Sequence, residues 1–348
     1  MKKIYIVAPD IHVKDAVGNF CFDLASLYNS AGHSAVLCAQ NYTYEEMEVR
    51  HVDYMFENIN DDDVLFICYS IEDRYLDRYL ELKNHKICYF HGVTPPELLE
   101  SFDPVVAQQC RNSYGQFPKL DTCKYIIASS QFTADFLSGF LNGRKIDVLP
   151  PVFKKRFEGK HPKEHKVQNE DTVKVLCVGR VAPNKNIEQV IEIFAGFSRM
   201  QKNSVLRIVG SNHNDNYNKV LYEIIDRMSI SDKVIFTGMV KDDELFDEFQ
   251  NADIFITASN HEGFCIPVLE AMFFGLLTVA KKGNAAAEVL GDSGYSFDAN
   301  EAPEETAAAI YKYFSDKKTT DDLVSKGFKR ADEYTSKNTA DVWCRYLI

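Results

Sequence analysis

The chain has 348 residues, of which 45% are apolar and 12% aromatic, and this composition excludes an intrinsically disordered protein. Nine cysteines, an odd number without any C-x-x-C pair, exclude a disulfide scaffold and a cysteine zinc cluster. The net charge of −12 would repel a phosphate backbone, so we expect no nucleic acid partner. Single cores rarely grow beyond roughly 250–300 residues, so the length predicts two domains.

The first residues, Met1 to Val7, are typical of a buried strand rather than a signal peptide. No run of 18 apolar residues follows, which is the length that a membrane-spanning helix needs. We therefore expect a soluble, cytoplasmic protein.

Short apolar segments alternate with segments of helical periodicity along the whole chain. The expected strands are 4–8, 34–39, 64–69, 86–91, 124–129, 146–149, 173–178, 204–209, 233–237, 254–258 and 277–280. Apolar strands separated by helices predict parallel sheets with helices on both faces. Several thiols lie within these strands, as reduced, buried cysteines do.

A polar, lysine-rich segment, 153–172, interrupts this alternation and is expected to be a linker. It separates an N-terminal domain, 1–152, from a C-terminal domain, 173–333. Each domain is predicted to be Rossmann-like, a doubly wound parallel sheet that binds ligands at the carboxyl ends of its strands. Two such sheets facing one another would form a central cleft. The closing helix, 337–347, carries Trp343 and is a candidate to pack back on the first domain.

The most informative segment is the strand 254–258 with the loop and helix that follow it. Pro267 lies in the first helical turn, where its missing N–H would be unpaired in any case. Free N–H groups near this helix start predict an anion site. Glu262 in the loop and Glu270 in the helix can bind hydroxyls on two parts of one phosphate-bearing ligand, and a nucleotide sugar offers that combination.

Glu262 and Glu270, with seven residues between them, resemble the E-x7-E motif of retaining GT-B glycosyltransferases of family 4, the glycosyl transferases group 1. The surrounding sequence is similar to that family's signature, although Cys265 stands where glycine is frequent. The resemblance implies the GT-B fold, with an N-terminal acceptor domain and a C-terminal nucleotide-sugar donor domain. It places Glu262 beside the transferred sugar and Glu270 on the ribose. It assigns four neighbours to the nucleotide-sugar site: Gly263, Phe264, Val268 and Leu269.

A second strand, 173–178, runs into a loop that carries Arg180 and Lys185. Two cations at this position can neutralise a diphosphate leaving group. The spacing is similar to the G-R-x4-K diphosphate loop of the same family. Asn186 is expected to cap the next helix, with Gln189 in the reciprocal position.

The remaining candidates follow other strands. By resemblance, Gly210, Gly238 and Met239 contact the base and a neighbouring phosphate. In the first half, Gly18 is the one glycine of a loop in which the family usually has a pair. His91 begins a segment similar to the family's His-x-x-[ST]-P, which would place it near the donor sugar; a purely structural histidine is equally compatible.

One acidic run, Asp61 to Asp63, superficially resembles the metal-binding D-x-D of another glycosyltransferase fold. It precedes its strand and so faces away from the ligand edge, which favours a solvated turn. No metal and no cofactor are predicted. The helix 103–116 offers an apolar face for peripheral membrane contact, but core packing is the favoured interpretation.

The predicted function is metal-independent, retaining transfer of a sugar from a UDP-, GDP- or other nucleoside diphosphate sugar to an acceptor hydroxyl. The resemblance implies a glycan or lipid-linked saccharide acceptor, in surface polysaccharide or lipopolysaccharide biosynthesis. Two alternatives remain open: a sugar-nucleotide epimerase of the same fold, and a non-catalytic subunit that binds nucleotide sugars.

Overall fold

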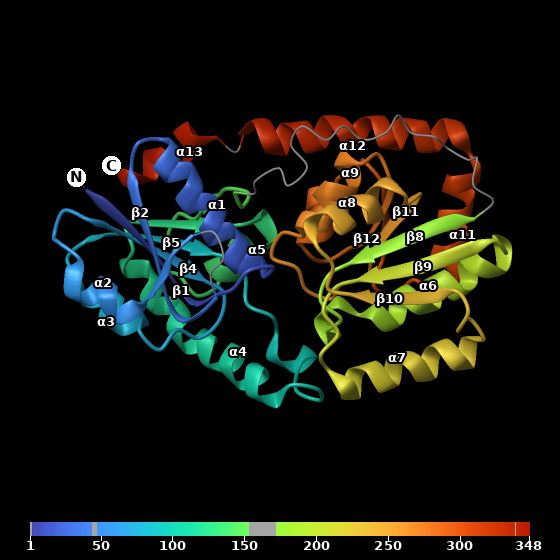
Figure 1. Ribbon diagram of the computed structural model, residues 1–348, viewed down its shortest axis with the longest axis horizontal. Helices are drawn as coiled ribbons and strands as arrows, with labels where there is room; N and C mark the ends of the chain where they lie inside the picture. Colours follow the sequence, from blue (N-terminus) through green and yellow to red (C-terminus); the bar gives the residue numbers. More distant parts are fainter. Residues whose placement is uncertain (1, 44–46, 153–171, 338) are drawn as a thin grey trace. The chain divides into compact units, whose positions relative to one another are not determined.

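The computed structural model describes residues 2–43, 47–152, 172–337 and 339–348, and these residues form two compact α/β units (Figure 1). Of the described residues, those up to 97, 104–152 and those from 335 onward form the first unit, and 98–103 and 172–334 form the second. The predicted linker, 153–172, lies outside the described residues except for Thr172.

The first unit contains a parallel sheet of seven strands in the order β3-β2-β1-β4-β5-β6-β7. Its strands are β1 (Lys3–Ile11), β2 (Ser34–Tyr42), β3 (Val49–His51), β4 (Val64–Tyr69), β5 (His85–Phe90), β6 (Tyr125–Ala128) and β7 (Asp147–Val148). Its longer helices are α1 (Ala16–Ser30), α2 (Val52–Asn58), α3 (Leu76–Glu81), α4 (Pro104–Gln116) and α5 (Gln131–Ser138). Because β1 lies between β2 and β4, the chain winds outward in both directions from this central strand.

One core of the first unit joins its sheet to α1 and to the end of the chain. Trp343, in α13 (Ala340–Cys344), is fully buried and its ring centroid lies 5.6 Å from that of Phe20. Tyr89 of β5 stacks on Phe20 with centroids 4.4 Å apart, and its ring also lies 5.5 Å from that of Trp343. The C-terminal residues therefore complete the core of the first unit.

The second unit contains a parallel sheet of six strands in the order β10-β9-β8-β11-β12-β13. Its strands are β8 (Val173–Val178), β9 (Ser204–Val209), β10 (Val234–Gly238), β11 (Ile254–Thr257), β12 (Leu277–Lys281) and β13 (Tyr295–Phe297). Its helices are α6 (Ile187–Met200), α7 (Asp215–Met228), α8 (Asp242–Gln250), α9 (Ile266–Phe273), α10 (Ala285–Leu290), α11 (Pro303–Ser315) and α12 (Lys317–Lys337). The prediction of two doubly wound parallel sheets is confirmed.

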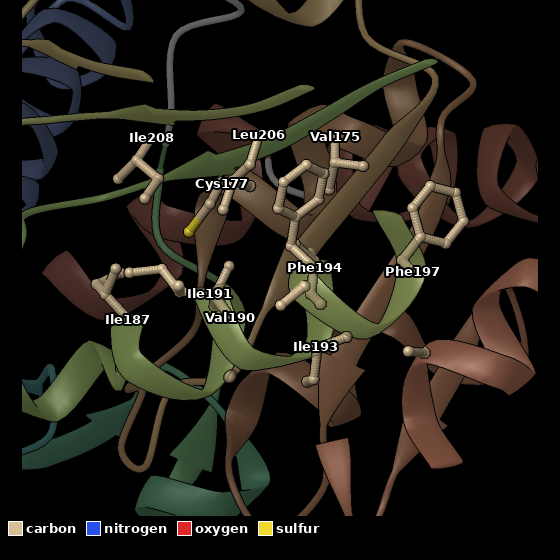
Figure 2. Packing of buried hydrophobic residues seen from close by; sticks show 14 of the residues in the cluster. Val175, Cys177, Ile187, Val190, Ile191, Ile193, Phe194, Phe197, Leu206 and Ile208 are labelled. Atoms are coloured by element: carbon tan, nitrogen blue, oxygen red, sulfur yellow. The ribbon is translucent and has the colours of Figure 1, made fainter. Parts of the chain in front are cut away.

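Helices cover both faces of the second sheet, with α6 and α7 on one side and α8 and α9 on the other (Figure 1). Figure 2 shows how Val190 and Phe194 of α6 pack against Val175 and Leu206 of the sheet. This packing fixes the start of α6, and with it the loop from β8, over the carboxyl edge of the sheet.

A short segment from the first half of the sequence, Leu98–Asp103, belongs to the second unit. The Phe102 ring lies 5.2 Å from the Tyr217 ring, centroid to centroid, and the Phe102 carbonyl oxygen accepts a hydrogen bond of 3.2 Å from Asn214. Sequence periodicity did not predict this exchange, because the contact depends on one aromatic residue in an irregular segment.

The structure corrects two local predictions. Asp61 and Asp62 lie exposed in a turn as predicted, but Asp63 is 3% exposed and accepts backbone hydrogen bonds from Lys3 and Asn60 at 2.8 and 2.9 Å. Asn186 does not cap α6 with its side chain; it adopts φ 50°, and its amide donates to Gln189 at 2.8 Å.

Helix α4 turns Ala107, Cys110 and Ser113 into the protein and leaves Val105 exposed. Its buried face agrees with the favoured interpretation of core packing. Among the described helices, none combines the length and apolar character that crossing a membrane requires.

Candidate active site

Glu262 lies in the loop between β11 and α9, and it is 92% shielded from solvent, with 8% of its surface exposed. Its Oε1 accepts a hydrogen bond of 2.7 Å from Ser259 Oγ. The Nζ of Lys185 lies 2.7 Å from Oε1 and 2.9 Å from Oε2. Both carboxylate oxygens of this buried glutamate are therefore paired with donors.

Lys185 reaches Glu262 because their two strands are neighbours. Strand β8 pairs with β11, so the loops that follow them meet at the carboxyl edge of the sheet. The backbone N–H of Asn260 donates to the carbonyl of Asn184 at 2.9 Å, which ties the two loops together. The structure thus brings together residues that the sequence analysis assigned to two separate motifs.

The ion pair keeps both groups charged. Burial alone would raise the pKa of Glu262, but the Lys185 ammonium and the hydrogen bonds from Lys185 and Ser259 hold it below its ordinary value. Burial alone would lower the pKa of Lys185, but the Glu262 carboxylate raises it. A carboxylate and an ammonium are therefore both present at neutral pH.

Arg180 lies at the start of the same loop and is exposed. It forms no ion pair with any other described residue, and its charge acts to lower the pKa of Lys185, so the two cations lie close together. Arg180 is thus available to a ligand, while Lys185 has three N–H donors of which Glu262 engages two.

Lys281 is a further cation at this edge that the sequence analysis missed. It is the last residue of β12, which pairs with β11, and its Nζ donates to Asn260 Oδ1 at 2.6 Å. Burial lowers its pKa. Asn284 supports the same loop by donating to the carbonyl of Ser259 at 2.8 Å. The sequence feature that could have predicted Lys281 as a site residue is its position at the end of an apolar strand.

Glu270 lies in α9, half-buried, eight residues beyond Glu262. The helix begins after Cys265, which adopts φ 78°. That left-handed backbone explains why glycine suits this position, since only glycine adopts it without strain.

The other residues predicted around this helix have buried side chains or pack against other residues. Val268 and Leu269 are buried in the core, and Phe264 packs edge-on against Tyr334 with centroids 5.5 Å apart. The Val268 N–H already donates to the Cys265 carbonyl oxygen at 3.1 Å. Contacts of these residues and of Gly263 with a ligand stay predictions. The N-terminal end of α9 would add its positive dipole.

Gly210 follows β9 and Gly238 ends β10, and the two positions differ in how much space they leave for a side chain. A Cβ on Gly210 would lie 1.9 Å from the carbonyl oxygen of Gly179, so close packing of two strand ends requires glycine there. A Cβ on Gly238 would meet nothing within 4 Å, although its φ is 71°. Met239, next to it, is 59% exposed. Contacts of these three residues with a base or phosphate stay predictions.

Two predicted residues belong to the first unit. His91 follows β5, and its ring packs edge-on against Phe20 and Tyr89 at 4.8 and 4.7 Å between centroids. Its Nε2 is buried and has no hydrogen-bond partner among the described residues, and burial lowers its pKa to about 3. Gly18 lies in the first turn of α1, where a Cβ would come within 1.9 Å of the His12 carbonyl oxygen.

Residues 160–330 match the family described as Glycosyl transferases group 1. The chain is 25% identical over 163 residues to O-antigen chain mannosyltransferase B of Escherichia coli, covering 47% of this chain and 42% of that protein. It is 28% identical over 181 residues to the lipopolysaccharide 1,2-N-acetylglucosaminetransferase of Salmonella typhimurium, covering 49% and 48%. The aligned segments thus span less than half of these curated relatives.

Solved structures share the fold over the full length. The crystal structure of WaaG, a glycosyltransferase involved in lipopolysaccharide biosynthesis, has a TM-score of 0.78 at 12% identity and covers 99% of both chains. Anabaena Alr3699/HepE in complex with UDP and glucose has a TM-score of 0.72 at 16% identity, with 98% of this chain and 97% of that chain covered. The described residues contain no group of three His, Cys, Asp or Glu arranged to hold a metal ion.

Proposed function

Since residues 160–330 belong to the glycosyl transferases group 1, we propose that the protein is a retaining glycosyltransferase with a nucleoside diphosphate sugar as donor. It moves the sugar to an acceptor hydroxyl, and the second unit holds the donor at the carboxyl edge of β8 and β11.

The buried Lys185–Glu262 pair is the observation that carries this proposal. An ionised glutamate paired with Lys185, with Arg180 and Lys281 on neighbouring segments of the same sheet edge, suits a ligand with both hydroxyls and negative charge. Glu262 would accept hydrogen bonds from the sugar, and Glu270 from the ribose.

Departure of the diphosphate is the electrostatic problem of the reaction. Arg180, Lys185 and the N-terminal end of α9 are placed to stabilise the negative charge that develops on the leaving group. These fixed positive groups supply what a divalent cation supplies elsewhere, and we therefore propose metal-independent transfer without a cofactor.

The acceptor and the setting are also part of the proposal. The relatives named O-antigen and lipopolysaccharide transferases support a glycan or a lipid-linked saccharide as acceptor. An enzyme that glycosylates a lipid-linked acceptor would act in the cytoplasm, at the inner face of a membrane. Its contact with that membrane would be peripheral.

The direct test is to incubate the protein with a panel of UDP-, GDP- and ADP-sugars and glycan acceptors. Transfer is measured as release of the nucleotide. Glu262→Gln should lower the rate by about 10²–10³-fold, as loss of one charged contact in a transition state does. Because it also leaves Lys185 without its carboxylate, the rate is compared at a temperature where melting curves show the variant to be folded. The matched control is Glu192→Gln, a glutamate of α6 outside this site. Full activity of Glu262→Gln would overturn the proposed role.

The same incubations separate the alternatives. Interconversion of a sugar nucleotide without acceptor would assign an epimerase, and tight binding without any turnover would assign a binding subunit. Retention would be read from the anomeric configuration of the product.

A further inference from the structure

Ser259 is a buried serine that donates its proton to the carboxylate of the candidate site. It is 1% exposed, and its Oγ donates to Glu262 Oε1 at 2.7 Å. Two other buried serines of the same unit, Ser198 and Ser204, donate instead to backbone carbonyl oxygens three residues earlier. A serine hydroxyl has one proton to donate, and that of Ser259 goes to a functional group rather than to the backbone.

The direction of this hydrogen bond follows from the charge of Glu262. An ionised carboxylate only accepts, so the Ser259 hydroxyl must be the donor. Thr257, the last residue of β11, is buried two positions earlier, and its Oγ1 lies 3.0 Å from Ser259 Oγ. Since the Ser259 proton is directed at Glu262, the Thr257 hydroxyl donates to Ser259. Both protons therefore point toward the carboxylate, and each hydrogen bond strengthens the next.

The backbone of Ser259 is fixed as well. Asn284 Nδ2 donates to the Ser259 carbonyl oxygen at 2.8 Å, while Asn284 Oδ1 caps α10 by accepting from the N–H of Ala286 at 2.8 Å. The next residue, Asn260, is tied through its N–H to the loop that follows β8. Ser259 is thus a rigid donor, held from β11, from α10 and from the β8 loop.

The two oxygens of Glu262 differ as a result. Oε1 accepts from Ser259 and from Lys185, both at 2.7 Å. Among the described residues, Oε2 accepts from Lys185 alone, at 2.9 Å. A carboxylate oxygen has room for about two hydrogen bonds, so Oε1 is filled and Oε2 can accept one more. The oxygen left for a ligand hydroxyl is therefore Oε2.

Lys185 alone would not orient the carboxylate in this way. The terminal torsion of a glutamate side chain is broad, so the plane of the carboxylate turns easily. The Lys185 ammonium lies at the end of a flexible stem and can follow that rotation. The short Ser259 side chain, with its backbone fixed, holds one oxygen in place and thereby aims the other.

We propose that Ser259 is a positioning residue of the donor site: it holds one oxygen of Glu262 so that the other, Oε2, accepts a hydrogen bond from a hydroxyl of the transferred sugar. Thr257 supports it by donating to Ser259 Oγ. The inference rests on the proposed function, since it names the transferred sugar as the partner of Oε2. It follows that loss of the Ser259 hydroxyl affects the sugar and leaves the nucleoside diphosphate unaffected.

The test compares Ser259→Ala with the wild type on two ligands. One is the sugar nucleotide that reacts in the panel of UDP-, GDP- and ADP-sugars, and the other is its UDP, GDP or ADP without the sugar. The kcat should fall about 10- to 100-fold, as loss of a hydrogen bond to a charged group does. The Kd of the free nucleotide, from calorimetry, should be unchanged. An unchanged kcat, or an equal loss of nucleotide affinity, would overturn the proposal.

The matched control is Ser204→Ala, which removes a buried hydroxyl from the start of β9, at the amino edge of the same sheet. This variant should keep the kcat of the wild type. Melting curves set a temperature at which both serine variants are folded. If Ser204→Ala lost as much kcat as Ser259→Ala, the effect would be one of stability, and the positioning role would be wrong.

Thr257→Val removes the neighbouring hydroxyl and retains the shape of the side chain. It should lower kcat less than Ser259→Ala does, because Ser259 still donates to Glu262. In the Ser259→Ala background it should have no further effect, since it acts through Ser259. Independent, additive losses would contradict the role of Ser259 as the link between Thr257 and Glu262.

One further arm needs no donor. Urea unfolding of Ser259→Ala, Glu262→Gln and the double variant should give non-additive losses of stability, because the two side chains interact. Strict additivity would overturn the proposal whether or not the protein transfers a sugar. An active wild type with an equally active Ser259→Ala defeats this inference alone. A wild type that turns over no sugar nucleotide defeats the proposed function, and the sugar as partner of Oε2 with it.

Discussion

Lys185 and Glu262 are 77 residues apart in the sequence, yet the ammonium of one lies within 2.9 Å of both carboxylate oxygens of the other. The side chains are 23% and 10% exposed, so water screens this pair weakly. Removing one partner leaves a buried charge without its counterion, and this consequence is measurable.

Lys185→Met should therefore destabilise the protein by about 3–5 kcal/mol, which is the usual cost of breaking a buried ion pair. It should also raise the pKa of Glu262, because the ammonium that lowers it is gone. Urea unfolding at pH 7 measures the first effect. The double variant Lys185→Met/Glu262→Gln should lose less stability than the sum of the single variants, and strict additivity would show that the two charges do not interact.

Gly210 and Gly238 offer a matched pair for backbone packing. Gly210→Ala places a methyl group 1.9 Å from the Gly179 carbonyl, at φ 149°, so the strand ends must move apart. We expect a loss of several kcal/mol, more than the roughly 1–2 kcal/mol for Gly238→Ala, whose methyl group meets nothing within 4 Å. Thermal unfolding of the two variants checks this order, and equal losses would contradict it.

Trp343 should anchor the end of the chain to the first unit. Trp343→Ala removes a fully buried indole from a cluster with Phe20, Phe66 and Tyr89 and should cost about 3–5 kcal/mol. Ile348→Ala is the control, since Ile348 is 83% exposed and should change stability by no more than about 0.5 kcal/mol. A melting temperature of Trp343→Ala equal to that of the control would contradict the packing.

Asp73 should make stability depend on pH. Burial raises its pKa to about 7 from an ordinary value of 3.8. The folded state therefore holds a proton that the unfolded state releases, so its contribution is fully present below about pH 4 and is lost as the pH rises through 7. Relative to Asp73→Asn, the wild type should lose roughly 2–4 kcal/mol between pH 4 and 8. Parallel pH profiles of the two proteins, from urea unfolding, would contradict this assignment.

The sequence predicted most of the strands because they are continuous apolar runs of about six residues. It missed β3 and β13, which are three residues each and too short to show a period. The return of Trp343 to the first unit was foreseen from its apolar helix. The placement of Leu98–Asp103 on the second unit was not, since tertiary contacts of an irregular segment leave no periodic signal.

In the candidate site too, local motifs were predicted from the sequence and tertiary contacts were not. Glu262 and Lys185 were both found, each within its own motif, but their ion pair depends on β8 and β11 being neighbours, which spacing alone does not reveal. Lys281 was missed because one lysine at the end of a strand resembles any solvated terminus. Asp63 was misjudged because its distant partner, the backbone N–H of Lys3, is determined by the register of β1 and β4.

The central claim is that the carboxyl edge of β8 and β11 binds a nucleoside diphosphate sugar, and thermal unfolding with a panel of such sugars tests it most directly. One donor should stabilise the wild type by about 2.7 kcal/mol at 100 times its Kd. The stabilisation should shrink markedly in Arg180→Ala, whose exposed side chain contributes little to the fold. If no sugar nucleotide raises the melting temperature, or if one does so equally in Arg180→Ala, the site assigned to the second unit is wrong.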